Sequence, residues 1–210
     1  MRTLRIDIVS DVVCPWCAIG LANLEKALAA AEVAADLRFH PLQLNPGLPA
    51  EGEKVAENVA RKYGITPEQA RERGGGVRAA AAEAGVAMTG RPDRLFDTFD
   101  AHRLLHWAGA MGRQLALKHA LFDAYFTKGL NVSDHGVLAD AAARAGLDRA
   151  AAAELLARGT FAAEVADDEI EWRAEGIAAV PTFVIDREFV INGAQPADRL
   201  ERALRKLAAR

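Results

Sequence analysis

The strongest constraint on this 210-residue chain is the spacing of its only two cysteines, Cys14 and Cys17. They follow an apolar run at residues 4–9 and precede a stretch, residues 19–28, whose apolar side chains recur at helical intervals. This order predicts a strand, a short loop and a helix, with Pro15 at the first helical position, where its missing N–H costs no hydrogen bond. A Cys-x-x-Cys pair that opens a helix after a strand is typical of thiol–disulfide exchange.

The two sulfurs are expected to differ in chemistry. At a helix start, Cys14 faces unpaired backbone N–H groups and the positive end of the helix dipole, which favour its thiolate. We therefore predict that Cys14 is the exposed, attacking sulfur, with a pKa below the usual value of about 8.5. Cys17, one turn into the helix, should be the shielded, resolving thiol with the higher pKa. Pro15 and Trp16 should contact the substrate and tune the redox balance of the pair.

The sequence gives weaker support to two other uses of a cysteine pair, a zinc site and a structural disulfide. A structural zinc site needs four ligands, and the chain has neither a second cysteine pair nor histidines at finger-like spacing. His102 and His106 lie four residues apart on one predicted helix, but two ligands do not make a metal site. We therefore predict no metal and packing roles for both histidines. A structural disulfide across two residues would close too short a loop to constrain the unfolded chain much.

The remaining histidines and the aromatic residues are predicted to be structural. His40 should be an interior group whose ring nitrogens have hydrogen-bond partners, and His119 and His135 should lie at the surface. Four aromatic residues of the helical region are expected in its core: Trp107, Phe122, Tyr125 and Phe126. Some of them could instead line a groove near Cys14.

Composition excludes several classes of partner. The net charge of −3 gives no electrostatic reason to expect binding to nucleic acid or to an anionic membrane. No apolar run approaches the roughly 20 residues that a membrane helix needs, and the N-terminus lacks the pattern of a signal peptide. These features predict a cytoplasmic protein. Since cytoplasmic thiols are kept reduced, a Cys-x-x-Cys pair there is expected to be catalytic or sensing.

A long helical stretch interrupts the strands. Residues 37–44 alternate apolar and polar and predict a second strand, which Pro41 makes an edge or irregular strand. From Glu51 to Gly176 the strand signals vanish, and Ala, Leu, Arg and Glu dominate, as a cluster of helices requires.

Several helix boundaries are legible within this stretch. Residues 66–69, Thr-Pro-Glu-Gln, form a capping box, and Pro92 is expected to open another helix. Asp134 and Asp148 are predicted helix caps. The glycines at 74–76 are expected to break a helix or to act as a hinge, because they lack the spacing of a phosphate-binding loop.

Strand signals return after Gly176. Residues 179–185 predict a third strand, the turn at Asp186-Arg187 leads into residues 188–191, and Pro196 starts a final amphipathic helix. The outline is an α/β fold, βαβ…αββα, with a large all-helical insertion. We expect residues 1–50 and 177–210 to form one domain and residues 51–176 to form the inserted helical domain.

A second motif stands apart from the cysteines. Proline is awkward in a strand because it donates no ladder hydrogen bond, yet Pro181 opens the third strand after Val180. The thioredoxin superfamily places a cis-proline here, facing the cysteine pair; the alternative is an ordinary trans-proline at the first residue of a strand. We predict a cis Val180–Pro181 bond that lies against Cys14, with backbone groups free to pair with an incoming peptide.

Five segments together resemble a known family: residues 14–17 (Cys-Pro-Trp-Cys), 99–108, 124–126, 180–185 and 193–196. They look like the FrnE-type branch of the DsbA-like thiol oxidoreductases, which is related to the 2-hydroxychromene-2-carboxylate isomerases and the kappa-class glutathione transferases. The resemblance implies a thioredoxin-like fold whose inserted helices cap the active site and line a substrate groove. Those related isomerases and transferases typically have serine where this chain has Cys14, so the retained cysteine favours disulfide chemistry.

The expected function is therefore that of an enzyme, a thiol–disulfide oxidoreductase or disulfide isomerase acting on protein or small-molecule substrates. It would use the Cys14–Cys17 pair, with Pro181 beside it, and no bound cofactor, with glutathione as a candidate co-substrate. Two alternatives remain open. One is a glutathione-dependent transferase or isomerase on the same fold, because a fold does not determine chemistry. The other is a non-enzymatic redox sensor or chaperone-like binding protein.

Overall fold

The computed structural model describes residues 2–90 and 92–210. A four-stranded sheet forms its centre, in the strand order β2-β1-β5-β6. Strand β1 (Leu4–Ser10) pairs in parallel with β2 (Ala35–Pro41) and antiparallel with β5 (Thr182–Ile185), which pairs antiparallel with β6 (Phe189–Asn192). The predicted α/β class and the order of strands around the helical stretch are confirmed.

Burial explains why β1 is central. Its apolar residues Leu4, Ile6, Ile8 and Val9 are at most 2% exposed. Strand β2 alternates between more and less exposed positions and lies at the edge, as its proline predicted. It ends at Pro41 rather than at residue 44, because the next backbone groups leave the ladder for other partners.

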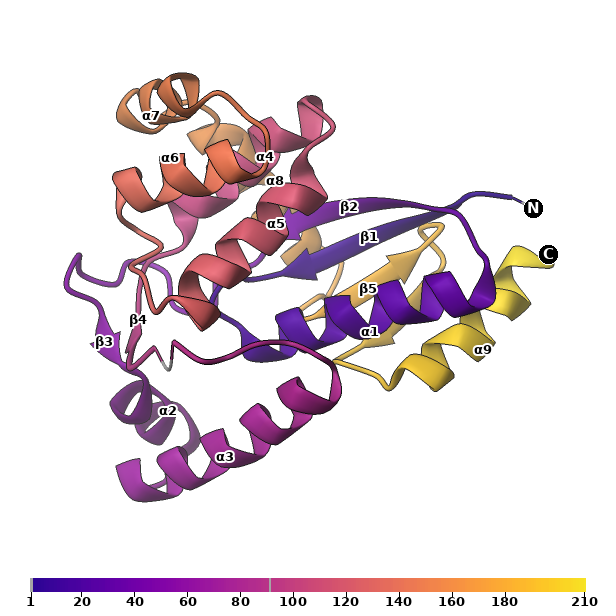
Figure 1. Cartoon of the computed structure of the whole chain (residues 1–210), viewed down its shortest axis with the longest axis horizontal. Helices are drawn as coiled ribbons and strands as arrows, with labels where there is room; N and C mark the ends of the chain where they lie inside the picture. Colours follow the sequence, from indigo (N-terminus) through magenta and orange to yellow (C-terminus); the bar gives the residue numbers. More distant parts are fainter. Residues whose placement is uncertain (1, 91) are drawn as a thin grey trace.

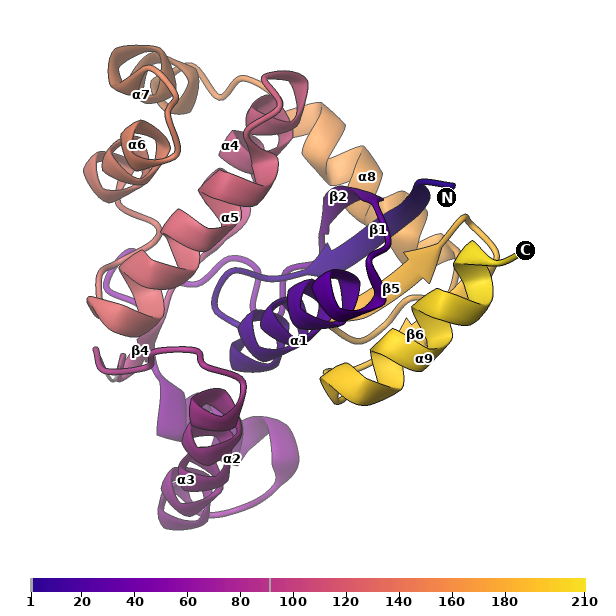
Figure 2. The ribbon, with the colours of Figure 1, turned by 45° about the vertical axis from the view of Figure 1, so that its right-hand side comes forward.

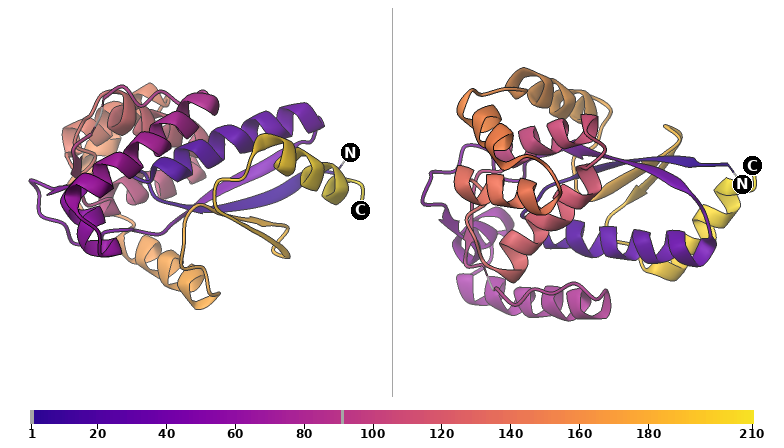
Figure 3. Two further views of the ribbon diagram at one scale, coloured as in Figure 1. Left: turned by 90° about the horizontal axis from the view of Figure 1, so that it is seen from below. Right: turned by 45° about the horizontal axis from the view of Figure 1, so that its top comes forward.

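Helices cover both faces of the sheet. Helices α1 (Pro15–Ala31) and α9 (Ala197–Ala208) pack together on one face, and α8 (Ala162–Ala174) covers the other, as the left view of Figure 3 shows. Pro196 is the N-cap of α9, which confirms the predicted start of the last helix. The buried side of α9 carries Leu200, Leu204 and Leu207.

Most of the other helices lie between β2 and α8 along the chain (Figure 1). Figure 2 shows α4 to α7 gathered beyond one end of the sheet, with α2 and α3 as a separate pair. Their bounds are α2 Val55–Tyr63, α3 Pro67–Glu83, α4 Phe99–Ala110, α5 Gln114–Phe122, α6 His135–Arg144 and α7 Arg149–Ala157, with a π-helical turn, η1, at Asp123–Thr127. Thr66, Asp134 and Asp148 cap α3, α6 and α7 as predicted.

The inserted region is not entirely helical. Strands β3 (Glu53–Lys54) and β4 (Arg94–Leu95) form a short antiparallel pair. The prediction that Pro92 opens a helix is therefore wrong, and α4 begins only at Phe99. Hydrogen bonds between distant segments override the local start signal, because the backbone before α4 pairs with β3 and with the start of α2. For example, the Val55 N–H donates to the Asp93 carbonyl at 2.8 Å.

The glycines at 74–76 do not break a helix, contrary to the prediction. Helix α3 runs continuously through them. Each glycine costs roughly 1 kcal/mol relative to alanine in a helix. The capping box at its start and the packing of Ala81 and Ala84 against Ile19 of α1 offset this cost.

The last hairpin forms as predicted, although β5 begins at Thr182, three residues later than expected. Asp186 and Arg187 both have positive φ, 53° and 59°, as a two-residue hairpin turn requires. None of the helices in the described part of the chain has both the length and the apolar character that crossing a membrane requires.

Candidate active site

Cys14 and Cys17 lie in the first turn of α1, just after β1 ends. Cys14 is the N-cap residue, with extended backbone (φ −85°, ψ 114°), and Pro15 is the first helical residue. The Cys14 carbonyl accepts the N–H groups of Cys17 at 3.1 Å and Ala18 at 3.4 Å. This closes the turn around the pair, so the predicted strand, loop and helix order is confirmed.

The prediction that Cys14 is exposed is wrong. Its exposed fraction is 4%, and that of Cys17 is 2%. Both belong to the main hydrophobic cluster, and the Cys14 sulfur contacts the Val180 carbonyl at 4.0 Å, so the distant segment before β5 covers it. Trp16, in contrast, is 43% exposed and presents apolar surface to solvent beside the pair.

The two thiols are shifted in opposite directions. A hydrogen bond from the Cys17 thiol to the Cys14 sulfur, helped by backbone N–H groups of the first helical turn, holds the pKa of Cys14 below its ordinary value. Burial and the neighbouring Cys14 anion raise the pKa of Cys17 well above its ordinary value. Neither sulfur forms a disulfide in this structure, so the pair is in its dithiol form.

Residues 179–181, the segment before β5, lie against the cysteine pair through Val180. The Val180–Pro181 peptide bond is cis, which confirms that prediction, and Val180 contacts Cys14. The Pro181 carbonyl accepts the Gly193 N–H at 2.8 Å. The Thr182 hydroxyl donates to the Ala179 carbonyl at 2.8 Å, so the turn is held by its own side chain.

Gly20 allows α1 to approach this segment closely. A Cβ atom at Gly20 would lie 3.0 Å from Pro181 Cγ and 3.2 Å from Phe183 Cζ. No local sequence pattern marks Gly20, because the reason for a glycine here is its contact with residues of a distant segment, Pro181 and Phe183.

Gly20→Ala is therefore expected to destabilise the protein by about 1–3 kcal/mol, as overpacking does, and to change the alkylation rate of Cys14 by displacing Pro181. Gly76→Ala is a matched control, since a Cβ there meets nothing within 4 Å. It should stabilise α3 by about 0.5–1 kcal/mol. Denaturant titration and a thiol-alkylation time course measure both effects. Equal stability changes in the two variants would contradict the role of Gly20.

A buried group of charged residues underlies the cysteines, and the sequence analysis missed it. Asp11 is fully buried; its oxygens accept the N–H of Val12 at 2.7 Å, the N–H of Leu44 at 2.8 Å and His102 Nε2 at 3.3 Å. Burial opposes ionisation of Asp11, but the hydrogen bonds from His102 and the backbone outweigh it and hold the pKa of Asp11 below its ordinary value. Lys118 of α5 is buried as well, and the charge of Asp11 raises the pKa of this lysine.

The histidines do not form a shared site. His102 is buried against Asp11, whereas His106 is exposed, with its ring 5.0 Å from that of Phe161. His40 lies between Asp7 and Asp168, as an interior group with partners. His119 and His135 lie at the surface, as predicted. Across residues 2–90 and 92–210, no group of three or more candidate metal ligands is found.

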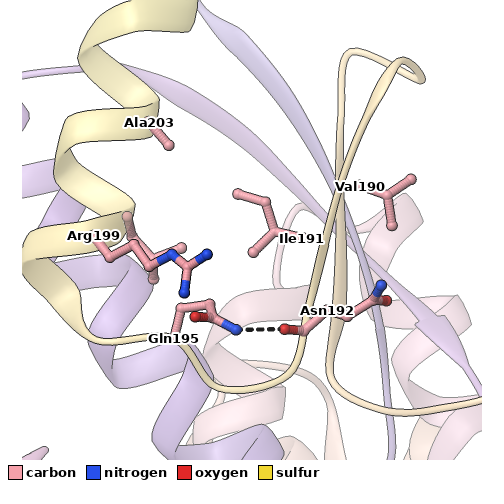
Figure 4. A pocket seen from close by; sticks show the side chains of 7 residues that line it. Val190, Ile191, Asn192, Gln195, Arg199 and Ala203 are labelled. Carbon is pink, nitrogen blue, oxygen red and sulfur yellow. Dashed lines mark hydrogen bonds between the residues drawn. The ribbon is translucent and has the colours of Figure 1, made fainter.

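Two surface hollows lie away from the cysteines. One, of about 370 Å³ between β6 and α9, is shown in Figure 4, with Gln195 Nε2 donating to the Asn192 carbonyl at 2.7 Å. The other, of about 290 Å³, is lined by Trp107 and Phe161. Neither of these two hollows is lined by Cys14 or Cys17. Phe122, Tyr125 and Phe126 are buried core residues, as predicted.

Comparison with known proteins gives a consistent result. The family model described as "DSBA-like thioredoxin domain" matches residues 5–205. A probable DsbA oxidoreductase, SCO1869 from Streptomyces coelicolor, is 37% identical, with a TM-score of 0.89 over 98% of this chain and 90% of its own. The uncharacterized protein YwbO of Bacillus subtilis is 28% identical over 204 residues, which are 96% of each chain.

Two more distant solved structures share the fold. The cytosolic disulfide reductase DsbM from Pseudomonas aeruginosa, solved with GSH, is 19% identical, with a TM-score of 0.65 over 98% of this chain and 100% of its own. A 2-hydroxychromene-2-carboxylate isomerase is 15% identical, with a TM-score of 0.70 over 97% and 96%.

Proposed function

Since this chain belongs to the family of DSBA-like thioredoxin domains, we propose that it is a thiol–disulfide oxidoreductase or disulfide isomerase that works through Cys14 and Cys17. The observation that carries the proposal is the placement of Cys14 at the N-cap of α1 with Cys17 in the first helical turn behind it. This placement lowers the pKa of Cys14 and, through burial, raises that of Cys17. A sulfur with a lowered pKa, such as Cys14, is more often ionised near neutral pH and therefore attacks the substrate first. Cys17 stays protonated and reacts only in the second step.

The reaction proceeds in two exchanges. The Cys14 thiolate attacks one sulfur of a substrate disulfide, an S–S bond forms between Cys14 and the substrate, and the other substrate sulfur leaves with the electron pair. Cys17 then attacks the Cys14 sulfur, which forms the Cys14–Cys17 disulfide and releases the second substrate thiol. The substrate is reduced and the pair is oxidised; the reverse sequence oxidises a dithiol substrate.

The groups around the pair suit this chemistry. The exposed ring of Trp16 and the adjoining Pro15 offer an apolar surface for a disulfide-bearing segment. Val180, whose carbonyl contacts the Cys14 sulfur, would pair with the backbone of a substrate strand, and Pro181 would hold that strand in place. We propose a cytoplasmic location for the reaction and no resident cofactor beyond the cysteine pair.

A glutathione-dependent isomerase or transferase is the second candidate. It is favoured by the fold shared with the 2-hydroxychromene-2-carboxylate isomerase and by the GSH bound to DsbM. Glutathione affinity together with full activity of a Cys17→Ser variant would support it, since that chemistry needs one activated group and no resolving thiol. Glutathione that only reduces the pair would instead be a co-substrate of the first function.

Redox titration and insulin reduction test the primary proposal. We expect Cys14 and Cys17 to interconvert reversibly between dithiol and disulfide, with a potential between about −270 and −120 mV, the range of related pairs. The wild-type protein should accelerate insulin reduction by dithiothreitol, and Cys14→Ser should not. A pair that forms no reversible disulfide would refute the proposal, and a reversible pair without turnover would favour the redox-sensor alternative.

A further inference from the structure

Lys118 is a buried cation that has no part in the two exchange steps of the proposed reaction. It is 1% exposed, and its Nζ has no hydrogen-bond partner among the residues that the structure describes. Its nearest aromatic neighbours are the rings of Phe122, 5.1 Å from Nζ, and Phe39, 5.6 Å away. An unpaired buried ammonium is costly, so the position calls for a compensating anion.

The fold holds Lys118 in this place through Gln114, one turn earlier on α5. The Gln114 side-chain amide accepts the Phe39 N–H at 2.9 Å and donates to the Phe39 carbonyl at 3.0 Å. It thereby pairs with the free edge of β2 as another strand would. Because residues four apart share a helix face, this contact directs Lys118 over Phe39 toward the interior.

Three acidic groups act on Lys118: Cys17, Asp11 and Cys14. Burial lowers the pKa of Lys118 to about 8, and the charges of these three groups oppose that shift. The carboxylate of Asp11 is already occupied by two backbone N–H groups and by His102. The thiolates of the two cysteines are therefore the anions left to balance the positive charge of Lys118. Of the two, Cys17 raises the pKa of Lys118 more strongly.

We propose that Lys118, although it belongs to the inserted helices, is a positioning residue whose ammonium group stabilises the Cys17 thiolate while Cys17 resolves the mixed disulfide. This inference rests on the proposed function. In the step, Cys17 attacks the Cys14 sulfur, the bond between Cys14 and the substrate breaks, and the substrate thiolate leaves with the electron pair. The proton lost by Cys17 neutralises that leaving thiolate, so the ammonium of Lys118 is unchanged at the end.

The assistance that Lys118 gives to the Cys17 thiolate should depend on pH. Below about pH 8 Lys118 is charged and assists the thiolate; above that pH it becomes neutral and the assistance is lost. The titratable groups whose charges act on Lys118 are Cys14 and Cys17 at the start of α1 and Asp11 in the loop after β1. His102 of α4 contacts Asp11. The neighbours on β2 and α5 are the uncharged rings of Phe39 and Phe122.

The experiment uses the reduced full-length protein with an aromatic disulfide, 5,5′-dithiobis(2-nitrobenzoate), in a stopped-flow instrument. The first thionitrobenzoate released reports attack by Cys14, and the second reports resolution by Cys17. For Lys118→Met at pH 7 we expect the second phase to slow by about tenfold or more, because a nearby buried charge is lost. The first phase should change by less than about threefold, and the difference from wild type should vanish above about pH 9, where Lys118 of the wild-type protein is neutral.

Lys128→Met is the matched control, since it removes the same charge from an exposed lysine paired with Asp123; both phases should stay at their wild-type rates. A second phase within twofold of wild type at every pH in Lys118→Met would overturn the inference. If that variant does not fold, the wild-type profile decides: resolution should show an inflection near pH 8, and its absence would overturn the inference. A wild-type protein that releases no second thionitrobenzoate would instead refute the proposed function.

Discussion

Replacing Cys14 by serine is expected to reduce disulfide exchange to the buffer background, whereas Cys17→Ser should capture substrates and fail to release them. The physical reason is the division of labour between the sulfurs. Of the two sulfurs, only Cys14 has a lowered pKa, and it lies at the N-cap of α1, two residues before the exposed Trp16. Without Cys17, no nearby thiol can break the mixed disulfide, since the chain has no third cysteine.

Non-reducing electrophoresis and mass spectrometry after mixing with a scrambled disulfide protein measure this outcome. Cys17→Ser should accumulate a covalent complex that dithiothreitol releases, and Cys14→Ser should accumulate none. A double variant, Cys14→Ser with Cys17→Ser, is the control for non-covalent association. Accumulation of complexes by Cys14→Ser instead would show that the two roles are reversed.

Asp11→Asn is expected to have the second largest effect, on stability and on thiol acidity at once. The substitution removes a buried charge that accepts hydrogen bonds from His102 and from two backbone N–H groups. Breaking such a buried network costs about 3–5 kcal/mol, and the lower end applies because the asparagine oxygen can still accept one N–H. The charge of Asp11 raises the pKa of Cys14, so the pKa of Cys14 should fall further in the variant.

The dependence on pH follows from the direction of the Asp11 shift. Its pKa in the folded protein lies below the ordinary value, so its contribution to stability is present above about pH 4 and is lost as the pH falls through the folded pKa. The stability difference between wild type and Asp11→Asn should therefore be full at pH 7 and shrink in acid. Urea titrations at several pH values, with thiolate absorbance at 240 nm for Cys14, measure both effects.

Asp140→Asn is a suitable control, because Asp140 forms an exposed ion pair with Arg149. Such a pair contributes about 0–1 kcal/mol, so this variant should keep nearly all of the wild-type stability. If Asp11→Asn were as stable as Asp140→Asn at pH 7, the buried network would have no energetic role. A raised pKa of Cys14 in Asp11→Asn would contradict the electrostatic argument.

Some features could be predicted from the sequence because their signals join residues a few positions apart. The helix start at Pro15, the caps at Thr66 and Asp134 and the two-residue turn before β6 each depend on a local pattern of backbone hydrogen bonds. The cis bond at Pro181 was predicted from the order of elements and from the thioredoxin-superfamily pattern, and the structure places Val180 against Cys14.

Other features depend on tertiary structure, and the predictions about them were wrong or absent. Cys14 is buried because residues 166 positions away cover it. The short β3–β4 strand pair replaces the helix start expected at Pro92, since its hydrogen bonds join segments about 40 residues apart.

The Cys-x-x-Cys pair could be found in the sequence alone, and so could the strand and helix that carry it and the α/β order of the chain, because these follow from local spacing and from periodicity. Only the tertiary structure decided what surrounds the pair. Asp11, His102 and Lys118 come from three separate elements, and no local pattern marks any of them as a neighbour of a cysteine. They become one group because the helical insertion packs against the end of the sheet, where the low dielectric of the interior makes each charge act strongly on the next.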